Sequence, residues 1–127
     1  MTDRLISVVD DDASVRWATV DLLASLGFAC EAFASADAYL QSDAASRTAC
    51  LILDVRMPGL NGLDLQRFLT DHGRAVPIIF ITSYPNERVR RRAIKGGAIC
   101  YLPKPYSDEE LLSCLHLALE MSKSRSP

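Results

Sequence analysis

The chain has 127 residues, of which 49% are hydrophobic and 24% are charged, and its formal net charge at pH 7 is -2. This composition is typical of one globular domain, and the near-neutral charge argues against nucleic acid or an anionic membrane as the main partner. No apolar run approaches the roughly 20 residues that cross a bilayer, and the start of the chain lacks the layout of a secretion signal. We therefore expect a cytoplasmic protein with neither a membrane nor a direct nucleic-acid partner.

Short β-rich runs alternate along the chain with segments of helical periodicity, which is typical of βαβ units and a parallel sheet. The predicted strands lie near Leu5–Val9, Phe28–Phe33, Cys50–Leu53, Ile78–Ile81 and Ala98–Leu102. The third and fourth runs consist almost entirely of Ile, Leu and Phe, so we expect them at the centre of the sheet, covered on both faces. The fold class is therefore α/β.

The first helix follows the first strand. Asp12 is its predicted N-cap, and Gly27 is expected to end it. Its apolar face is predicted to comprise Val15, Ala18, Leu22, Leu23 and Leu26. Trp17 is out of phase with that face, so we expect it to be partly exposed, either as an anchor for a partner or as a single exposed apolar residue.

Two later helices have recognisable starts. Asn61 and Asp64 predict a helix that buries Leu65, Phe68 and Leu69. Ser107 and Glu110 form a predicted capping box for the last helix. Because helical periodicity is lost from Ser122, the expected division is a domain at 1–122 followed by a disordered tail or linker stub at 123–127.

The cysteines are scattered singly, at Cys30, Cys50, Cys100 and Cys114. None belongs to a C-x-x-C pair or stands at metal-ligand spacing from a histidine, so neither a zinc site nor a redox motif is indicated. We predict reduced cysteines that serve as small packing residues.

Charged residues follow three of the predicted strands. Asp10 and Asp11 come after the first, Asp54 ends the third, and Lys104 follows the fifth. Because the carboxyl ends of parallel strands share one edge of the sheet, these side chains should converge there. Three carboxylates repel one another, so we expect a hard divalent cation between them, with Lys104 placed to receive an anion such as phosphate.

Four blocks carry a family resemblance: Val8–Asp12, Leu53–Gly59, Ile81–Ser83 and Leu102–Tyr106. Their order and separation resemble the receiver domain of two-component response regulators. Further segments resemble its FixJ-like branch: Phe33–Ala36, Pro77–Thr82 and Ala93–Ala98. The resemblance implies a flavodoxin-like (βα)5 receiver, a doubly wound five-stranded parallel sheet in the order 2-1-3-4-5.

The resemblance also implies a phosphoacceptor site. By similarity, Asp54 accepts a phosphoryl group from a sensor histidine kinase, as a carboxylate nucleophile. Mg²⁺ is the implied cofactor, held by Asp11, Asp54 and the backbone carbonyl of Arg56, with Asp10 acting through water. Mg²⁺ and Lys104 would neutralise the oxygens of the transferring group.

A switch is implied as well. Thr82 would donate to a phosphoryl oxygen, and Tyr101, at the aromatic switch position, would turn inward and alter the surface of the fourth helix, fifth strand and fifth helix. A half-buried tyrosine that switches nothing is the alternative for Tyr101. The Lys104-Pro105 peptide is expected to be cis by the same resemblance.

Arg56 and Tyr84 occupy positions that tune phosphate lifetime in this family, and the bulk of Tyr84 predicts slow hydrolysis. A basic stripe comprises Arg88, Arg91, Arg92 and Lys95 on the fourth helix. It is either a solvated face or a docking surface for an acidic partner or a second receiver.

The resulting functional hypothesis is a response-regulator receiver that assists its own phosphorylation and dephosphorylation without being a turnover enzyme. Its output would be partner binding, dimerisation or transcription control through a further domain. A phosphorylation-independent interaction module on the same fold is the alternative. A phosphohydrolase acting on other substrates is a weaker third hypothesis, because no general acid or substrate pocket is evident.

Overall fold

The computed structural model describes residues 4–124. Its elements are β1 (Leu5–Val9), α1 (Ala13–Ser25), β2 (Ala29–Phe33), α2 (Ala36–Leu40), the 3-10 helix η1 (Asp43–Ser46), β3 (Thr48–Asp54), α3 (Gly62–Asp71), β4 (Ile78–Thr82), α4 (Glu87–Lys95), β5 (Cys100–Pro103) and α5 (Asp108–Ser124). Among the described residues, no helix is both long and apolar enough to span a membrane.

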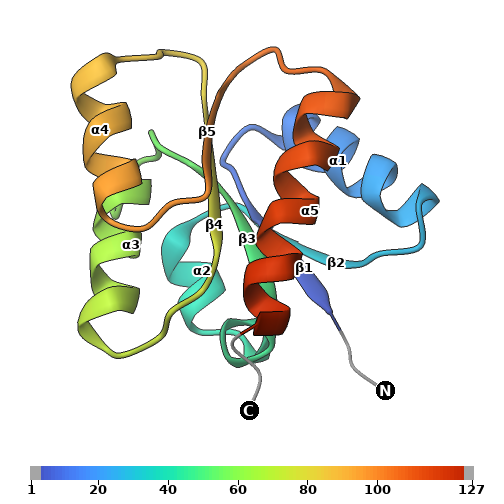
Figure 1. Cartoon of the computed structure of the whole chain (residues 1–127), viewed down its shortest axis with the longest axis horizontal. Coiled ribbons are helices and arrows are strands. Elements are labelled where there is room, and N and C mark those ends of the chain that lie inside the picture. The colour runs from blue at the N-terminus through green and yellow to red at the C-terminus, as the bar shows by residue number, and fades with distance from the viewer. Residues whose placement is uncertain (1–3, 125–127) are drawn as a thin grey trace.

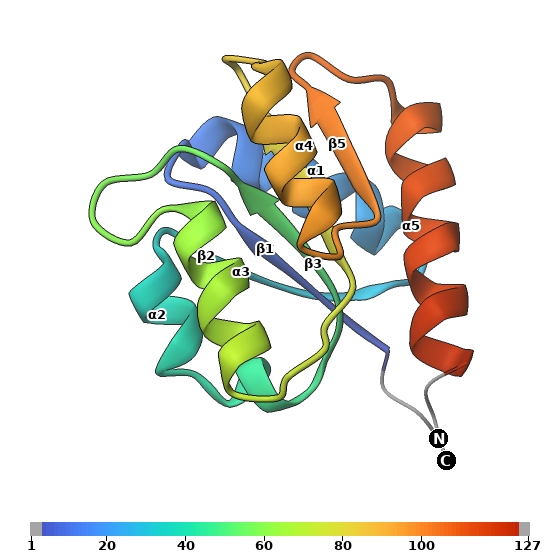
Figure 2. The same cartoon turned by 60° about the vertical axis from the view of Figure 1, so that its left-hand side comes forward.

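The five strands form one parallel sheet in the order β2-β1-β3-β4-β5. Helices α1 and α5 cover one face, and α2, α3 and α4 cover the other (Figures 1 and 2). The strand order reverses next to β1, which makes the carboxyl ends of β1 and β3 the expected place for a ligand. The predicted doubly wound α/β fold is confirmed.

Alternation along the strands divides the core between the two faces of the sheet. On β1, Ile6 and Val8 belong to the apolar cluster under α1 and α5, whereas Leu5 and Val9 belong to the cluster under α2, α3 and α4. The prediction that the third and fourth strands are covered on both sides is confirmed, because β4 is buried throughout and β3 is buried from Cys50 to Asp54. Every residue of β1 is buried as well. Such a two-sided core fixes the register that brings the strand ends level.

The predicted helix starts are present. The carboxylate of Asp12 accepts from the backbone N–H groups of Ser14 and Val15 at the start of α1. Asn61 and Asp64 form a reciprocal capping box at the start of α3. Ser107 and Glu110 form a second capping box before α5. The Ser107 N–H donates to Oε1 of Glu110 at 2.9 Å, and the Glu110 N–H donates to Oγ of Ser107 at 3.0 Å. Helix α5 continues to Ser124, past the domain boundary expected at 122, and residues 125–127 lie outside the described part of the chain.

Two predicted helix faces are partly wrong. On α1 the buried residues are Thr19 and Leu23, whereas Ala18 is exposed and Leu26, at the C-cap, is 50% exposed. On α3, Phe68 is 38% exposed and stacks on His72 with ring centroids 4.0 Å apart. Helical periodicity identifies a broad face, but the neighbouring elements determine which part of it is covered.

The prediction for the cysteines is correct for Cys30 and Cys50, which are unpaired, and wrong for Cys100 and Cys114. The last two form a disulfide between β5 and α5, with their Cα atoms 6.1 Å apart. Their separation of 14 residues fits no motif. The pairing arises because α5 folds back along β5, which a spacing rule does not detect.

Candidate functional site

Three carboxylates meet at the carboxyl edge of the sheet. Asp10 follows β1 directly and Asp54 ends β3, and the two strands are level there because Val9 pairs with Leu53. Oxygen atoms of Asp10, Asp11 and Asp54 all lie within 4.8 Å of one another. Asp10 and Asp54 are buried and Asp11 is exposed, so this acidic cluster is open to solvent on the side of Asp11.

Lys104 approaches the same cluster from the end of β5. Its Nζ donates to Oδ2 of Asp10 at 3.0 Å and to Oδ2 of Asp54 at 3.3 Å. The backbone N–H of Lys104 donates to the carbonyl of Thr82 at 2.7 Å, which holds the segment against β4. The Lys104-Pro105 peptide is cis, as expected. All four predicted charged residues therefore converge as proposed.

The electrostatics of this cluster are unbalanced, with three acids opposed by one lysine. Burial and the neighbouring Asp10 together raise the pKa of Asp54 to about 6, against the lowering effect of Lys104 and the Arg56 N–H. Burial also lowers the pKa of Lys104, but the carboxylates of Asp10 and Asp54 outweigh it and leave that pKa raised. The site thus has an excess of negative charge that a cation would relieve.

The donor set fits a hard divalent cation. It consists of carboxylate oxygens, which Mg²⁺ prefers, and Mg²⁺ commonly uses only one or two protein carboxylates together with water. Asp11 is the most accessible acid. Both oxygens of Asp10 already have partners, because Oδ1 accepts from the Asp12 N–H at 2.9 Å and Oδ2 accepts from Lys104. Both oxygens of Asp54 also have partners, but at longer distances, 3.2 Å from Oδ1 to the Arg56 N–H and 3.3 Å from Oδ2 to Lys104. Asp11 and Asp54 are therefore the better direct ligands, and Asp10 suits a role through water.

Thr82 reaches the same edge as the last residue of β4, and it is buried. Its Oγ1 accepts a hydrogen bond from the Tyr84 N–H at 3.0 Å. The hydroxyl therefore has a partner in the β4–α4 loop in this conformation. The following residue, Ser83, is small and exposed.

Tyr101 lies away from the acids and contacts the start of α4. Its side chain is half-buried on β5, and its Oη accepts from the Asn86 N–H at 3.2 Å. Asn86 is the N-cap of α4, with its side chain accepting from the Val89 N–H. Tyr101 consequently connects β5 to the beginning of α4, which is a suitable place for a switch residue.

Arg56 and Tyr84 contact each other above two neighbouring loops. The guanidinium carbon of Arg56 lies 4.8 Å from the centroid of the Tyr84 ring, a cation–π geometry. Tyr84 is 66% exposed. The sequence assigned the two residues separately to kinetic tuning, and the structure brings them together as one pair.

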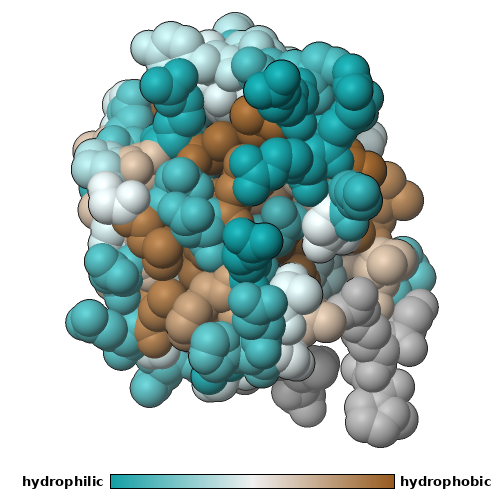
Figure 3. All heavy atoms as spheres, turned by 90° about the vertical axis from the view of Figure 1, so that its left-hand side faces the viewer, coloured by the Kyte–Doolittle hydropathy of each residue, from teal (hydrophilic) through white to brown (hydrophobic). Residues whose placement is uncertain are grey.

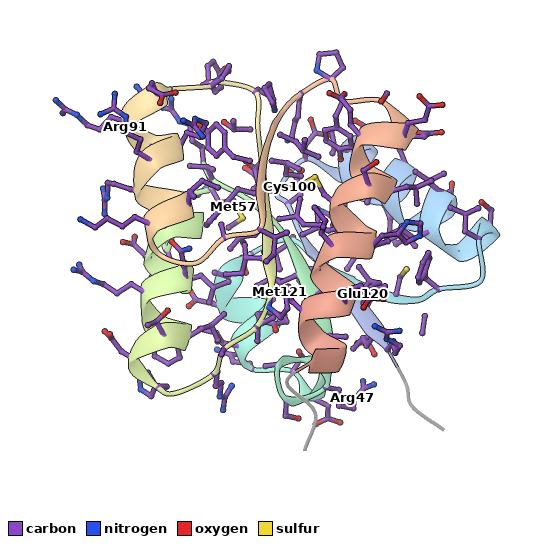
Figure 4. The ribbon with its side chains drawn as sticks, viewed as in Figure 1. Arg47, Met57, Arg91, Cys100, Glu120 and Met121 are labelled. Atoms are coloured by element: carbon purple, nitrogen blue, oxygen red, sulfur yellow. A yellow bond between two sulfur atoms is a disulfide. The ribbon has the colours of Figure 1, made fainter. Side chains whose placement is uncertain are left out.

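The predicted partner residues are exposed. Trp17 on α1 is 58% exposed, with Arg16 against its ring. The basic stripe on α4 is exposed along its length, and Arg91 points outward from that helix (Figure 4). Figure 3 shows this side of the molecule, with hydrophilic side chains surrounding an apolar area. Glu87 pairs with Arg90 and Arg91, and these arginines hold the pKa of Glu87 at about 2.

Sequence reasoning missed three supporting residues. Arg16 donates to the backbone carbonyl of Asp10 at 2.7 Å, and no local pattern indicates this bond. Gln66 is buried on α3 and donates to the Ala93 carbonyl at 3.0 Å, which connects α3 with α4. Gly62 lies so close to β3 that a Cβ there would be 2.5 Å from the Asp54 carbonyl oxygen. The Asn-Gly pair at the helix start was the available signal for Gly62.

A doubly wound sheet with clustered acids and a lysine at the carboxyl ends of its strands defines a class, that of receiver-type phosphoacceptor domains. A family model described as the response regulator receiver domain matches residues 6–116. The chain belongs to the response regulator receiver family, as the four sequence blocks predicted.

Named relatives agree with this membership. Nodulation protein W of Bradyrhizobium diazoefficiens is 44% identical over 98% of this chain and 55% of its own length. Response regulator protein TodT of Pseudomonas putida is 42% identical over 96% of this chain and 55% of its own length. The chain thus spans about half the length of these curated relatives.

Solved structures show the same fold. A structure of the response regulator StyR superposes with a TM-score of 0.89 and 40% identity, covering 95% of this chain and 61% of that one. The crystal structure named FixJ-N superposes with a TM-score of 0.85 and 32% identity, covering 94% of this chain and 96% of that one. The resemblance to the FixJ-like branch agrees with this neighbour.

Proposed function

We propose that this chain is the cytoplasmic phosphoacceptor of a two-component relay and that Asp54 receives the phosphoryl group. In the reaction a carboxylate oxygen of Asp54 bonds to phosphorus as the bond from phosphorus to the donor histidine nitrogen breaks, and the freed imidazole takes up a proton. The observation that carries the proposal is the convergence of Asp10, Asp11 and Lys104 on Asp54. The domain modifies itself and does not turn over external substrates.

Asp11, Asp54 and the backbone carbonyl of Arg56 would hold Mg²⁺, and Asp10 would act through water. When bound, Mg²⁺ neutralises negative charge on the transferring phosphoryl oxygens. Lys104 would neutralise a second phosphoryl oxygen. Its Nζ lies 3.3 Å from Asp54 Oδ2 and can exchange that contact for a contact with the phosphoryl group. Positioning and charge neutralisation are the main requirements of phosphoryl transfer.

Thr82 would connect the modification to the output surface. Its hydroxyl donates to a phosphoryl oxygen when it turns from the Tyr84 N–H toward Asp54, and the β4–α4 loop must then rearrange. Tyr101 contacts the end of that loop at Asn86, so the rearrangement changes the packing of Tyr101. The result is a population shift in the surface of α4, β5 and α5.

That surface is the proposed output of the domain. Its basic stripe on α4 suits an acidic partner or a second receiver, and a longer protein would couple it to transcription control through a further domain. The partner that supplies phosphate is a sensor histidine kinase, with exposed Trp17 on α1 as a candidate anchor.

Chemical mapping tests the proposed acceptor. The protein is phosphorylated with acetyl phosphate and Mg²⁺, and the acyl phosphate is trapped by borohydride reduction, which converts the modified aspartate to homoserine. Peptide sequencing by mass spectrometry should find homoserine at position 54. Homoserine at position 10 or 11 in place of 54 would contradict the assignment.

The Arg56–Tyr84 pair predicts a slow loss of phosphate. Tyr84→Ala should accelerate dephosphorylation several-fold, because the proposed role of this ring, which lies against Arg56, is to shield the phosphoaspartate from water. Tyr84→Phe is the matched control, since it keeps the ring and should retain the wild-type rate. The rates are measured by the decay of phosphoprotein after removal of the phosphodonor. Equal rates in Tyr84→Ala and wild type would rule out the shielding role.

A further inference from the structure

The bridge between β5 and α5 is a feature that the phosphoacceptor chemistry does not use. Cys100 begins β5 and Cys114 lies in the second turn of α5. Their Cα atoms are 6.1 Å apart, within the range of about 4.4–6.8 Å that disulfides require. Figure 4 shows Cys100 on the side of β5 that faces α5. Cys100 is half-buried and Cys114 is buried, so Cys100 is the more accessible partner.

The other two cysteines, Cys30 and Cys50, are unpaired and cannot bridge to each other. Ile6 pairs with Cys30 on one side and with Cys50 on the other, so two strand spacings separate them. Those spacings add up to about 9–10 Å, beyond the roughly 7 Å limit for a bridge between Cα atoms. Burial also raises the pKa of Cys50 to about 12, which leaves its thiol unreactive. Among the described residues, Cys100–Cys114 is therefore the bridge that the structure forms, and Cys30 and Cys50 add no second one.

The bridge encloses functionally important residues. The loop that it closes contains Tyr101, the cis Lys104-Pro105 peptide and the first turn of α5. Cys100 packs with the apolar cluster under α1 and α5, whereas Tyr101 packs with the cluster on the opposite face of the sheet. The covalent bond thus fixes α5 to the strand that carries Tyr101 without occupying the space in which Tyr101 moves.

We propose that Cys100 and Cys114 form a reversible thiol–disulfide site, oxidised by a low-molecular-weight disulfide, that fixes α5 against β5 in the oxidised state. The thiolate of Cys100, the more accessible partner, attacks the reagent disulfide and releases one thiol. Cys114, after losing its proton, attacks Sγ of Cys100 in the mixed disulfide and releases the second thiol. The two cysteines lose two electrons and two protons, and the reagent disulfide gains them as two thiols.

A regulatory consequence rests on the proposed function, but the thiol chemistry does not. The oxidised form holds one side of the α4, β5 and α5 surface in place, so phosphorylation would act on a surface with less freedom to rearrange. Disulfides in reducing compartments are usually transient or redox-sensing, which favours a reversible role over a purely structural one for a cytoplasmic receiver.

Thiol counting across glutathione buffers tests the site. The protein is equilibrated at several ratios of reduced to oxidised glutathione, quenched with acid, unfolded and alkylated with N-ethylmaleimide before intact-mass measurement. Wild type should shift reversibly between a form with all four cysteines alkylated and a form with two alkylated. The Cys30→Ser/Cys50→Ser variant should shift between two alkylated cysteines and none, and Cys100→Ser should keep all three of its cysteines alkylated at every ratio. Four alkylated cysteines at every ratio, or a persistent bridge in Cys100→Ser, would overturn the proposal.

Hydrogen exchange tests the mechanical part. Amides of α5 should exchange several-fold more slowly in the oxidised protein, and its melting temperature should be higher by about 5–15 °C, from the entropy of a closed loop of this length. Identical α5 exchange in the two states would refute the fixing of α5. Phosphorylation is measured separately on both forms. A protein that forms the bridge but accepts no phosphate would contradict the proposed function alone.

Discussion

Asp54→Asn is expected to stabilise the metal-free protein. Asp54 is buried beside Asp10, and its pKa is raised from 3.8 to about 6. The charged carboxylate is therefore less favourable in the folded state than in the unfolded state. This penalty is absent below about pH 4, grows between about pH 4 and pH 6, and is fully present above that range. The wild type should therefore lose stability as the pH rises across that interval.

The size of the effect follows from the shift. At about 1.4 kcal/mol per pKa unit the upper limit is about 3 kcal/mol. That pKa already includes the attraction of Lys104, 3.3 Å away. Asparagine, however, places an amide N–H group where the carboxylate accepted hydrogen bonds, which costs part of the gain. The expected gain is therefore about 1–2 kcal/mol near neutral pH. That corresponds to a rise in melting temperature of roughly 3–8 °C.

Thermal unfolding in the presence of a chelator measures this gain. Asp12→Asn is the matched control, because Asp12 is an exposed N-cap and asparagine caps equally well, so no gain is expected. Adding Mg²⁺ should raise the melting temperature of the wild type more than that of Asp54→Asn. If the metal-free Asp54→Asn variant is less stable than wild type, the ionised carboxylate of Asp54 does not destabilise the folded protein.

Gly62→Ala should destabilise the fold and impair the site together. A Cβ at this position would lie 2.5 Å from the Asp54 carbonyl oxygen and 3.0 Å from both the Phe80 ring and the Val55 Cα. Two of these neighbours are backbone atoms of β3 and its continuation, so α3 has to move away from the strand that carries Asp54. We expect a loss of about 2–3 kcal/mol, as for other overpacked sites, and a lower rate of phosphorylation.

Gly73→Ala separates the two effects. Gly73 follows α3 with a φ of +70°, and nothing lies within 4 Å of the Cβ that a substitution would add. Its cost should be only the roughly 1–2 kcal/mol of a left-handed backbone, with the wild-type rate of phosphorylation. Urea unfolding and phosphoprotein formation provide the two measurements. Wild-type stability in Gly62→Ala would mean that α3 is less closely held than its contacts indicate.

The sheet and the acidic edge were predictable because their signals are local. Apolar runs identified the strands, and Asp54 and Lys104 stand directly at the strand ends, so parallel pairing was enough to bring them together. The capping residues Asn61 and Ser107 likewise act on their own helices. Such features depend on a few neighbouring residues, and tertiary packing confirms them without altering them.

The remaining features required three-dimensional information. Pairing of Cys100 with Cys114 depends on the angle at which α5 returns along β5, and the Arg56–Tyr84 contact joins two loops whose conformations no sequence pattern specifies. On α3, Phe68 is 38% exposed, whereas the polar side chain of Gln66 is buried and donates to the Ala93 carbonyl of α4. These outcomes are set by how elements pack, which periodicity within one element does not encode.

Intact mass after incubation with acetyl phosphate tests the central claim most directly. The wild type with Mg²⁺ should gain one phosphoryl group, and neither Asp54→Asn nor wild type with a chelator should gain one. Beryllofluoride binding, measured alongside, detects a site whose phosphate is lost too quickly to be weighed. Absence of both the adduct and beryllofluoride binding in the wild type would contradict the account, and a phosphorylation-independent interaction module on the receiver fold would replace it.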